Sequence, residues 1–284
     1  MSRINEPRMH FDFEDTRIEI TALTRDHLMQ TIAARLSAQI GFALATINLD
    51  HLVKLRKDPS FRAAYAQHEI VVADGNPIVW LSRLANRPVE LLPGSELIEP
   101  LTRLAAEQGV PVAFFGSNAD VLEHAAAVLK QRHPGLKLAA RIAPPMGFDP
   151  CGPKAERLIK ELAASGAGLC FVALGAPKQE EFAIFGRGLA PQIGFVSIGA
   201  GLDFIAGQQI RAPRILRLLA LEWLWRLALA PKRLALRYFH CFTILPVQAL
   251  RAWRLRTAPE QPDAHPGPNS ALAKPMNIHR ETER

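Results

Sequence analysis

The sequence predicts a doubly wound α/β fold with a mainly parallel sheet. Short apolar runs, typical of buried parallel strands, alternate with segments of helical periodicity. The links between them are short and rich in Gly, Pro, Asn and Asp. Such alternation requires right-handed crossover connections, which place helices on both faces of the sheet.

The first half of the chain contains three predicted strands. In order, we expect a short strand at 17–21, a helix at 25–39, a strand at 41–47, a helix at 49–67, a strand at 69–73 and a helix at 78–85. Residues before about Asp15 are polar and are expected to form a loose lead-in.

The second half continues the same alternation. Ser95, in the turn Leu92–Glu96, is a predicted N-cap for a helix that runs to about Gln108. In order, we then expect a strand at 111–116, a helix at 119–132, a strand at 136–143, a helix at 153–164, strands at 169–174 and 193–198, and a helical segment opening at Lys178 between those two strands.

Positive charge is concentrated near the C-terminus. Residues 211–256 contain ten Lys and Arg and one acid, Glu222, which is a net charge of +9 against +7 for all 284 residues. We therefore divide the chain into a lead-in (1–15), a Rossmann-like α/β core (16–210), a basic, amphipathic helical C-terminal appendage (211–256) and a disordered tail (257–284).

Several classes of protein are disfavoured by composition. No uncharged apolar run reaches the roughly 18 residues of a membrane span, and the longest candidate, Tyr238–Leu250, includes His240 and Pro246. The three cysteines are widely spaced, which fits a reducing compartment and gives no zinc-ligand spacing. We expect a cytoplasmic protein, soluble or peripheral on a membrane.

The stretch from Leu169 to Glu181 is the clearest candidate for ligand binding. A buried strand ends in Gly175-Ala-Pro177, and Lys178 and Gln179 then open a helix. Strand-to-helix turns of this kind are where α/β folds hold anionic groups, because backbone N–H groups and the helix dipole favour negative charge. An ordinary βα turn is the alternative.

The other strand ends should meet at the same edge of the sheet, in one cleft. The candidate residues there are Thr46, Asn48, Asp74, Gly116, Gly147, Gln179 and Asp203. Asp74 leaves an apolar strand and is followed by Gly75, so its carboxylate is a candidate general base. A helix N-cap is the alternative role for Asp74.

Other polar residues at this edge also have two interpretations. Thr46 and Asn48 could bind a substrate hydroxyl or carbonyl, or could cap the following helix. The segment Gly199–Asp203 could hold a ribose or sugar hydroxyl, or could be a tight turn. No D-x-D motif occurs, so a sugar-nucleotide enzyme of this sequence would need cationic side chains to stabilise a diphosphate leaving group.

Arginines in the appendage could supply that charge. Arg226 and Arg233 are two helical turns apart, and Arg237 follows one turn later. A solvated basic face is the usual explanation for such a run. Here the interleaved Trp, Phe and Leu favour an anionic membrane surface. Nucleic-acid binding is disfavoured, since no recognised DNA- or RNA-binding motif is present.

Eight motifs, taken together and in order, resemble the WecG/TagA/CpsF glycosyltransferases from about Arg17 to Tyr238. They are Thr46-Ile-Asn48, Ala73-Asp-Gly75, Pro93-Gly-Ser95, Gly175-Ala-Pro-Lys-Gln-Glu180, Gly199-Ala-Gly-Leu-Asp-Phe204, Arg211-Ala-Pro213, Leu221-Glu-Trp-Leu-Trp-Arg226 and Pro231-Lys-Arg233.

The resemblance implies an inverting, metal-independent enzyme with no cofactor. Such an enzyme moves a sugar from a UDP-sugar to a polyprenyl-diphosphate-linked saccharide at the cytoplasmic face of the cell membrane. Family members transfer N-acetylmannosamine in teichoic acid and common antigen synthesis, or glucose in exopolysaccharide assembly. The sugar, the acceptor and the pathway of this chain stay open.

The resemblance also implies residue roles. Asp74 is similar to the base that acts on the acceptor hydroxyl, with Thr46 and Asn48 positioning substrate. The implied donor-site residues are Gly116, Gly175, Lys178, Gln179, Gly199 and Asp203, and the implied diphosphate or acceptor contacts are Arg211, Arg226, Arg233 and Arg237. Leu236 stands where the family often has a third arginine, with Arg237 adjacent, and Glu96 replaces the usual Asp.

Other classes of function remain as alternatives. A non-catalytic nucleotide- or lipid-binding module at the membrane would bind UDP without turnover. A nicotinamide enzyme is disfavoured because no complete G-x-G-x-x-G follows the first strand. A homo-oligomer stays open, since apolar positions of the appendage could pack between subunits.

Overall fold

A computed structural model of the chain describes residues 8–14, 16–209, 212–213, 215–216 and 220–257. Arg211 and the predicted tail from residue 258 onward lie outside the described residues, as do residues 1–7 of the predicted lead-in. The side chain of Arg233 is outside them too, although its backbone belongs to a helix.

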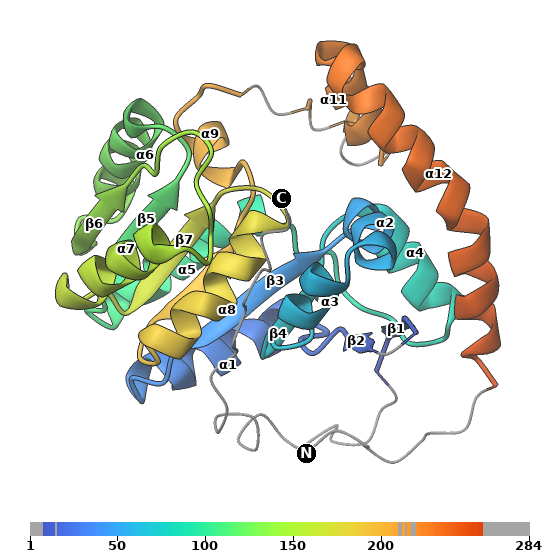
Figure 1. Ribbon diagram of the computed structural model, residues 1–284, viewed down its shortest axis with the longest axis horizontal. Coiled ribbons are helices and arrows are strands. Elements are labelled where there is room, and N and C mark those ends of the chain that lie inside the picture. The colour runs from blue at the N-terminus through green and yellow to red at the C-terminus, as the bar shows by residue number, and fades with distance from the viewer. Residues whose placement is uncertain (1–7, 15, 210–211, 214, 217–219, 258–284) are drawn as a thin grey trace, which may run out of the picture.

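A six-stranded, wholly parallel sheet forms the centre of the molecule (Figure 1), which confirms the predicted fold class. The strand order is β4-β3-β8-β7-β5-β6. The strands are β3 (Phe42–Ile47), β4 (Ile70–Ala73), β5 (Val112–Gly116), β6 (Leu138–Ile142), β7 (Leu169–Ala173) and β8 (Gly194–Ser197). Because all six run in one direction, their carboxyl ends share one edge.

Helices cover both faces of this sheet. One face packs against α1 (Arg25–Ser37), α5 (Gly94–Glu107), α6 (Ala119–Arg132) and α9 (Gly201–Ile205). The other packs against α2 (Leu49–Lys57), α3 (Pro59–Tyr65), α4 (Asn76–Leu84), α7 (Pro153–Ala164) and α8 (Lys178–Leu189).

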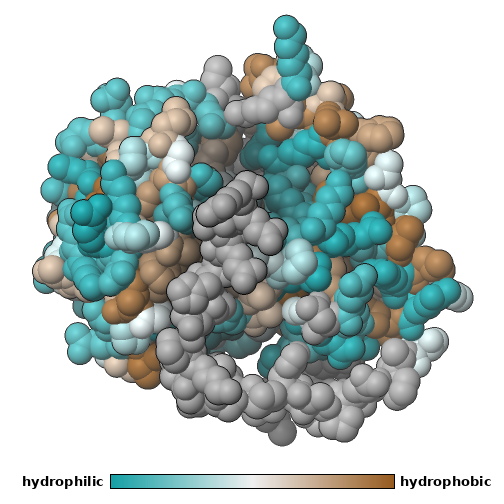
Figure 2. Space-filling model, in the orientation of Figure 1, coloured by the Kyte–Doolittle hydropathy of each residue, from teal (hydrophilic) through white to brown (hydrophobic). Residues whose placement is uncertain are grey.

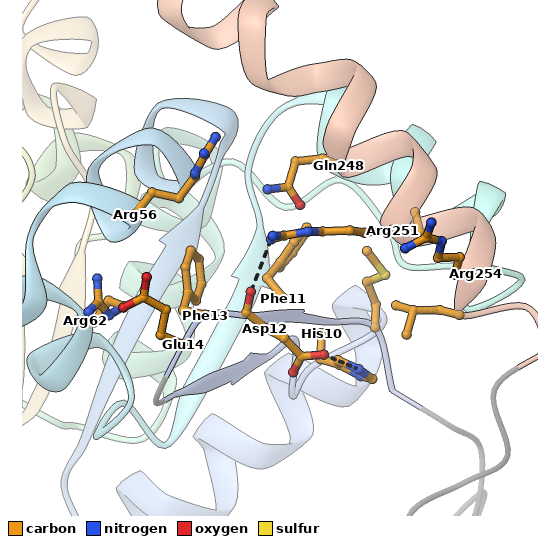
Figure 3. A pocket seen from close by; sticks show the side chains of 13 residues that line it. His10, Phe11, Asp12, Phe13, Glu14, Arg56, Arg62, Gln248, Arg251 and Arg254 are labelled. Carbon is orange, nitrogen blue, oxygen red and sulfur yellow. Dashed lines mark hydrogen bonds and ion pairs between the residues drawn. The ribbon is translucent and has the colours of Figure 1, made fainter.

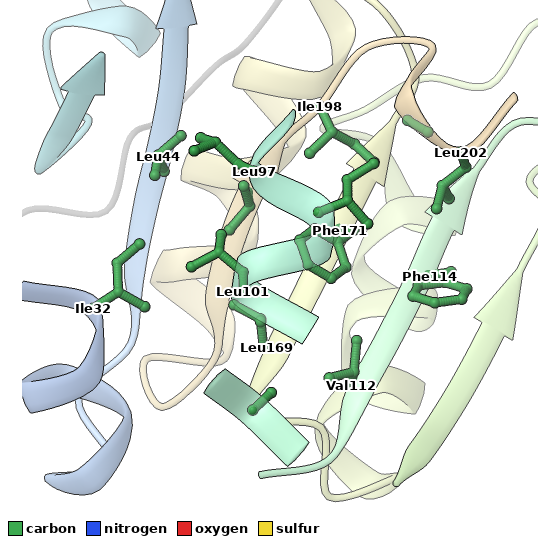
Figure 4. Close-up of a cluster of buried hydrophobic side chains, with 14 of the residues drawn as sticks. Ile32, Leu44, Leu97, Leu101, Val112, Phe114, Leu169, Phe171, Ile198 and Leu202 are labelled. Carbon is green, nitrogen blue, oxygen red and sulfur yellow. The ribbon is translucent and has the colours of Figure 1, made fainter. Parts of the chain in front are cut away.

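Alternate residues of each central strand enter opposite cores. Phe114 of β5 and Phe171 of β7 lie in the first core, with ring centroids 6.1 Å apart (Figure 4). Their neighbours Phe115 and Cys170 lie in the core on the other face. Each fully buried phenylalanine contributes about 2–3 kcal/mol of hydrophobic stabilisation. Burial on both faces explains why these strands are continuous apolar runs in the sequence.

The N-terminal segment differs from the expected loose lead-in. β1 (His10–Asp12) pairs antiparallel with β2 (Arg17–Glu19), and the pair is separate from the main sheet. Met9 and Phe11 are buried against the second core. These two side chains give the segment apolar surface to bury, although most of its residues are polar.

Two helix boundaries also differ from the prediction. The helix expected at 49–67 is two helices, because Asp58 caps α3 through its side chain and Pro59 occupies the first position. Ser95 is not an N-cap: α5 begins at Gly94, and no side chain caps it. The early start fits a close contact in which a Cβ on Gly94 would lie 3.1 Å from the Ser197 carbonyl oxygen.

Two further helices follow the core, α11 (Glu222–Leu229) and α12 (Pro231–Arg254). α12 lies along α2 and α4 (Figure 1). Its buried residues recur at helical spacing, namely Leu234, Cys241, Ile244, Gln248 and Ala252. Among the described residues, no helix is both long and apolar enough to cross a membrane.

Candidate active site

Asp74 and Asn48 lie side by side at the carboxyl edge of the sheet. The last paired residues of β3 and β4 are Ile47 and Ala73, so the next residue of each strand comes level with the other. The Asp74 amide donates to the Ile47 carbonyl oxygen at 2.8 Å, which continues the ladder by one bond. Two residues far apart in sequence are thereby brought together, as the strand-end argument predicts.

The backbone after Asp74 turns away at once. Gly75 has a φ of 103°, a conformation that favours glycine, and it is the N-cap of α4. No side chain caps this helix. The alternative role of Asp74 as a helix cap is therefore not realised, and its carboxylate is available at the edge of the sheet.

The pKa of the Asp74 carboxyl group lies close to neutral pH. Partial burial raises its pKa to about 6. The positive charges of Arg226 and Arg237 and a hydrogen bond from Asn48 favour the carboxylate, while the negative charge of Glu222 opposes it. A carboxylate with such a pKa is charged at pH 7 yet basic enough to accept a proton.

Asn48 caps the helix that follows it, which is one of the two roles that the sequence left open. Its Oδ1 accepts the backbone amide of His51 at 3.0 Å and so caps α2. Its side chain also hydrogen-bonds to Asp74. Because Oδ1 is engaged by the helix, the Nδ2 group is the donor to the carboxylate. Helix capping thus fixes the orientation of the amide that meets Asp74.

Thr46 is buried two residues earlier on β3. It lies beneath the start of α5, where a Cβ on Gly94 would approach its Cγ2 to 3.3 Å. Thr46 is therefore buried below the carboxyl edge of the sheet, whereas Asn48 and Asp74 lie at that edge.

Gln179 and Gly199 join β7 and β8 at the same edge. Gln179 is 2% exposed, and its Oε1 accepts the Gly199 backbone amide at 3.0 Å. Its Nε2 donates to Glu180 Oε1 at 2.8 Å. The glutamine amide thus holds the turn after β8 in place, a role that the sequence analysis did not foresee.

Glu180 is a fully buried carboxyl group beneath this turn. Burial raises its pKa to about 8, so it is mostly protonated at neutral pH. Its Oε2 has no hydrogen-bond partner among the described residues. The sequence analysis missed Glu180 as a site residue; its place beside Gln179 in the motif was the available signal.

Lys178 and Gly175 lie on the exposed side of the same turn. Lys178 Nζ donates to the Phe148 carbonyl oxygen at 2.8 Å, in the loop that contains Gly147. A Cβ added at Gly175 or at Gly199 would meet no atom within 4 Å. Space above these two glycines is therefore open to a ligand.

Gly116 and Asp203 extend the edge toward β5. A Cβ on Gly116 would come within 2.4 Å of the Ala173 carbonyl oxygen, so this glycine is required by strand packing itself. Asp203 is half-buried and hydrogen-bonds to Ser117, and burial raises its pKa. The described part of the edge thus extends from Asp74 on β4 to Asp203 beside β5.

Arg226 brings a positive charge to the site from α11. Its Nε donates to Glu222 Oε1 at 2.9 Å, and its guanidinium lies 5.4 Å from the centroid of the Phe204 ring. Arg226 is also the charged group that most favours the ionised form of Asp74. The cation predicted from the sequence therefore reaches the strand edge.

Arg237 brings a second positive charge, from α12. Its Nε lies 3.0 Å from Asp50 Oδ1, in the first turn of α2. Lys54 Nζ lies 2.8 Å from the other carboxylate oxygen and donates to the Ala176 carbonyl oxygen at 3.0 Å. Asp50 and Lys54 were not predicted as site residues, although their i, i+4 spacing was a visible signal.

The other two predicted arginines cannot be placed: Arg211 and the Arg233 side chain lie outside the described residues.

No group of three or more His, Cys, Asp or Glu side chains that could hold a metal ion occurs in the described part of the chain. The predicted metal independence stays a prediction, which a chelator can test.

Comparisons with known proteins agree with the motifs. The model of the glycosyl transferase WecG/TagA/CpsF family matches residues 13–259, which extends through α12. A protein of Bacillus spizizenii, named N-acetylglucosaminyldiphosphoundecaprenol N-acetyl-beta-D-mannosaminyltransferase, is 29% identical over 230 residues, covering 80% of this chain and 84% of the relative. A protein of the same name from Bacillus subtilis is 27% identical over 197 residues, covering 69% and 74%.

Proposed function

The chain belongs to the WecG/TagA/CpsF family of glycosyltransferases, and from this premise we propose that it transfers one sugar from a UDP-sugar to a saccharide linked to polyprenyl diphosphate. The product would enter a cell-surface polysaccharide such as an exopolysaccharide, teichoic acid or common antigen. The names of the two relatives support N-acetylmannosamine as the sugar and an N-acetylglucosamine-bearing undecaprenyl diphosphate as the acceptor.

The observation that best supports this function is the position of Asp74. Its carboxyl group, with a pKa of about 6, is held by Asn48 at the edge of a parallel sheet and faces the positive charge of Arg226. In the proposed reaction Asp74 accepts the proton of the acceptor hydroxyl as that oxygen attacks the anomeric carbon. The C–O bond to the diphosphate breaks on the opposite side, and UDP leaves, so the anomeric configuration inverts.

The leaving diphosphate needs positive charge close to the site. Arg226 and Arg237 are the described candidates, and the open space above Gly175 and Gly199 is where backbone N–H groups at the strand ends could meet phosphate oxygens. We assign the donor to this side, from Gly116 to Asp203, and the acceptor hydroxyl to the side of Asp74. No step in this proposal requires a metal ion.

A membrane contact is proposed from the outer surface of α11 and α12. Large apolar side chains are exposed there, among them Leu236, Phe239, Phe242, Leu250 and Trp253, each about half exposed or more. Figure 2 shows such brown side chains interspersed with teal ones along this side of the molecule. Exposed apolar residues next to arginines fit the interface of an anionic bilayer, where a polyprenyl-linked acceptor resides.

Turnover by the purified protein tests this proposal. The acceptor would be a synthetic prenyl-diphosphate-linked N-acetylglucosamine, and UDP-N-acetylmannosamine and UDP-glucose would be offered separately with EDTA present. Product from one donor supports the proposal and identifies the sugar. Tight UDP binding without product from any UDP-sugar would instead favour the alternative, a nucleotide- or lipid-binding module at the membrane.

A further inference from the structure

A cavity lies away from the candidate active site, beneath the C-terminal half of α12. It is an open cavity with a volume of about 590 Å³, lined by residues of β1 and its flanking segments, of α2 and α3, and of the end of α12 (Figure 3). Arg56, on its wall, is near the C-terminal end of α2, whereas Asn48 caps the other end. A nine-residue helix is about 13 Å long, so the cavity and Asp74 are separate places.

Positive charge dominates the walls of this cavity. Arg56, Arg251 and Arg254 line it, and none of the described acidic side chains forms an ion pair with them. Arg251 Nη1 donates to the Asp12 backbone carbonyl at 3.3 Å, which orients its guanidinium into the cavity (Figure 3). Two acids also line the cavity: Asp12 is paired with Arg17 at 2.7 Å, and Glu14 lies next to a fourth arginine, Arg62 (Figure 3).

Gln248 supplies a neutral polar group at the same place. It is 3% exposed, and its amide points into the cavity between Arg56 and Arg251 (Figure 3). Because the amide faces the cavity, its Nε2 group can donate to the oxygen of a ligand bound there.

We propose that this cavity is a phosphate-binding site, distinct from the site around Asp74. Guanidinium groups bind phosphate through paired, charge-assisted hydrogen bonds, and Gln248 would add a neutral donor. Phe11, Phe13 and Leu255 line the same cavity and would contact the organic part of a phosphate ester. The ligand is either a phospholipid headgroup or a free phosphate compound, which share this chemistry.

Binding here would join elements that are far apart in sequence. The arginines come from α2 and α12, and the aromatic residues come from β1 and the turn after it. A ligand that binds only the folded protein would therefore stabilise the docking of α12 and raise the melting temperature. The proposal does not depend on the transferase reaction, which involves other residues.

The test is calorimetric titration of the full-length chain with two probes. One is inorganic pyrophosphate, and the other is phosphatidylcholine vesicles with and without phosphatidylglycerol. Arg251→Gln should weaken binding of the active probe at least about tenfold, because a charge-assisted contact is lost. The matched control is Arg157→Gln, at an exposed arginine of α7, which should leave affinity unchanged.

Gln248→Met separates a ligand contact from a structural role. It should weaken binding while leaving the melting temperature of the free protein unchanged, since the amide faces the cavity. Response to pyrophosphate would identify a free phosphate ligand, and response only to phosphatidylglycerol would identify a lipid headgroup. The proposal fails if neither probe binds saturably, or if Arg251→Gln and Arg157→Gln bind alike.

Discussion

Arg237 of α12 and Asp50 of α2 form an ion pair, with Nε and Oδ1 3.0 Å apart. Asp50 follows Asn48 by two residues, so this pair attaches the C-terminal helix to the element that orients the Asp74 carboxylate. Burial disfavours the charged form of Asp50, yet Arg237 and Lys54 outweigh that effect and its pKa is lowered. The position of α12 and the geometry of the candidate site are therefore linked.

A double-mutant cycle on this pair should show coupling. We expect Asp50→Asn and Arg237→Gln each to lower the free energy of unfolding, with an interaction energy of about 1 kcal/mol, because one side chain is buried and the other half exposed. Chemical denaturation of the two single variants and the double variant measures it. Strictly additive effects would mean that the pair does not hold α12 to α2.

Two charges on α11 should move the pH dependence of activity in opposite directions. Burial raises the pKa of Asp74, Arg226 lowers it and Glu222 raises it. Arg226→Gln should therefore shift the acidic limb of kcat/KM to higher pH, and Glu222→Gln should shift it lower, each by up to about one pH unit. Shifts of the same sign in both variants would rule out Asp74 as the group titrating in that limb.

Glu180 should make the protein less stable at high pH. Burial raises its pKa from 4.5 to about 8, so the folded state holds the proton more tightly than the unfolded state. The resulting stabilisation is complete below pH 4.5 and is lost as the pH rises through about 8. Glu180→Gln removes this loss and keeps an acceptor for Gln179.

Denaturation of both proteins between pH 5 and 9 checks the Glu180 prediction. The variant should gain on the order of a few kcal/mol relative to the native protein across that range. Glu161→Gln, at an exposed acid of α7, is the matched control and should show no such trend. Parallel stability curves for Glu180→Gln and the native protein would contradict a buried, protonated Glu180.

The sheet and the meeting of Asp74 with Asn48 were predictable from local patterns. Apolar strands buried on both faces are visible as short runs, and parallel strands necessarily end at one edge. That rule brought together residues from β3, β4, β7 and β8 without knowledge of the strand order. The family motifs mark the same positions.

Other features depended on contacts that no local pattern reveals. Ser95 is a residue type that often caps helices, but α5 begins one residue earlier, at Gly94, which packs closely against the end of β8. The hydrogen bond from the Gly199 amide to Gln179 Oε1 joins residues twenty positions apart, and no local pattern predicts it. The strand His10–Asp12 forms in a largely polar segment because Phe11, together with the preceding Met9, packs against the second core.

The contacts of charged residues were likewise only partly predictable from the sequence. The arginines of the appendage were visible in the sequence, and so was the i, i+4 spacing of Glu222 and Arg226, but the contacts of Arg226 with the Phe204 ring and of Arg237 with Asp50 were not. These two contacts follow from where α11 and α12 lie on the core. Sequence could therefore predict which residues are cationic, and only the structure shows which of them approaches Asp74.

Replacement of Asp74 by asparagine tests the proposed mechanism most directly. The measurement is kcat/KM on the prenyl-diphosphate-linked acceptor as a function of pH, with Asp120→Asn, at an exposed residue of α6, as the matched control. The native protein should gain activity as the pH rises through about 6, as the carboxylate forms. Asp74→Asn should lose at least about 100-fold at pH 7 while remaining folded. Near-native turnover by Asp74→Asn would show that Asp74 is not the base.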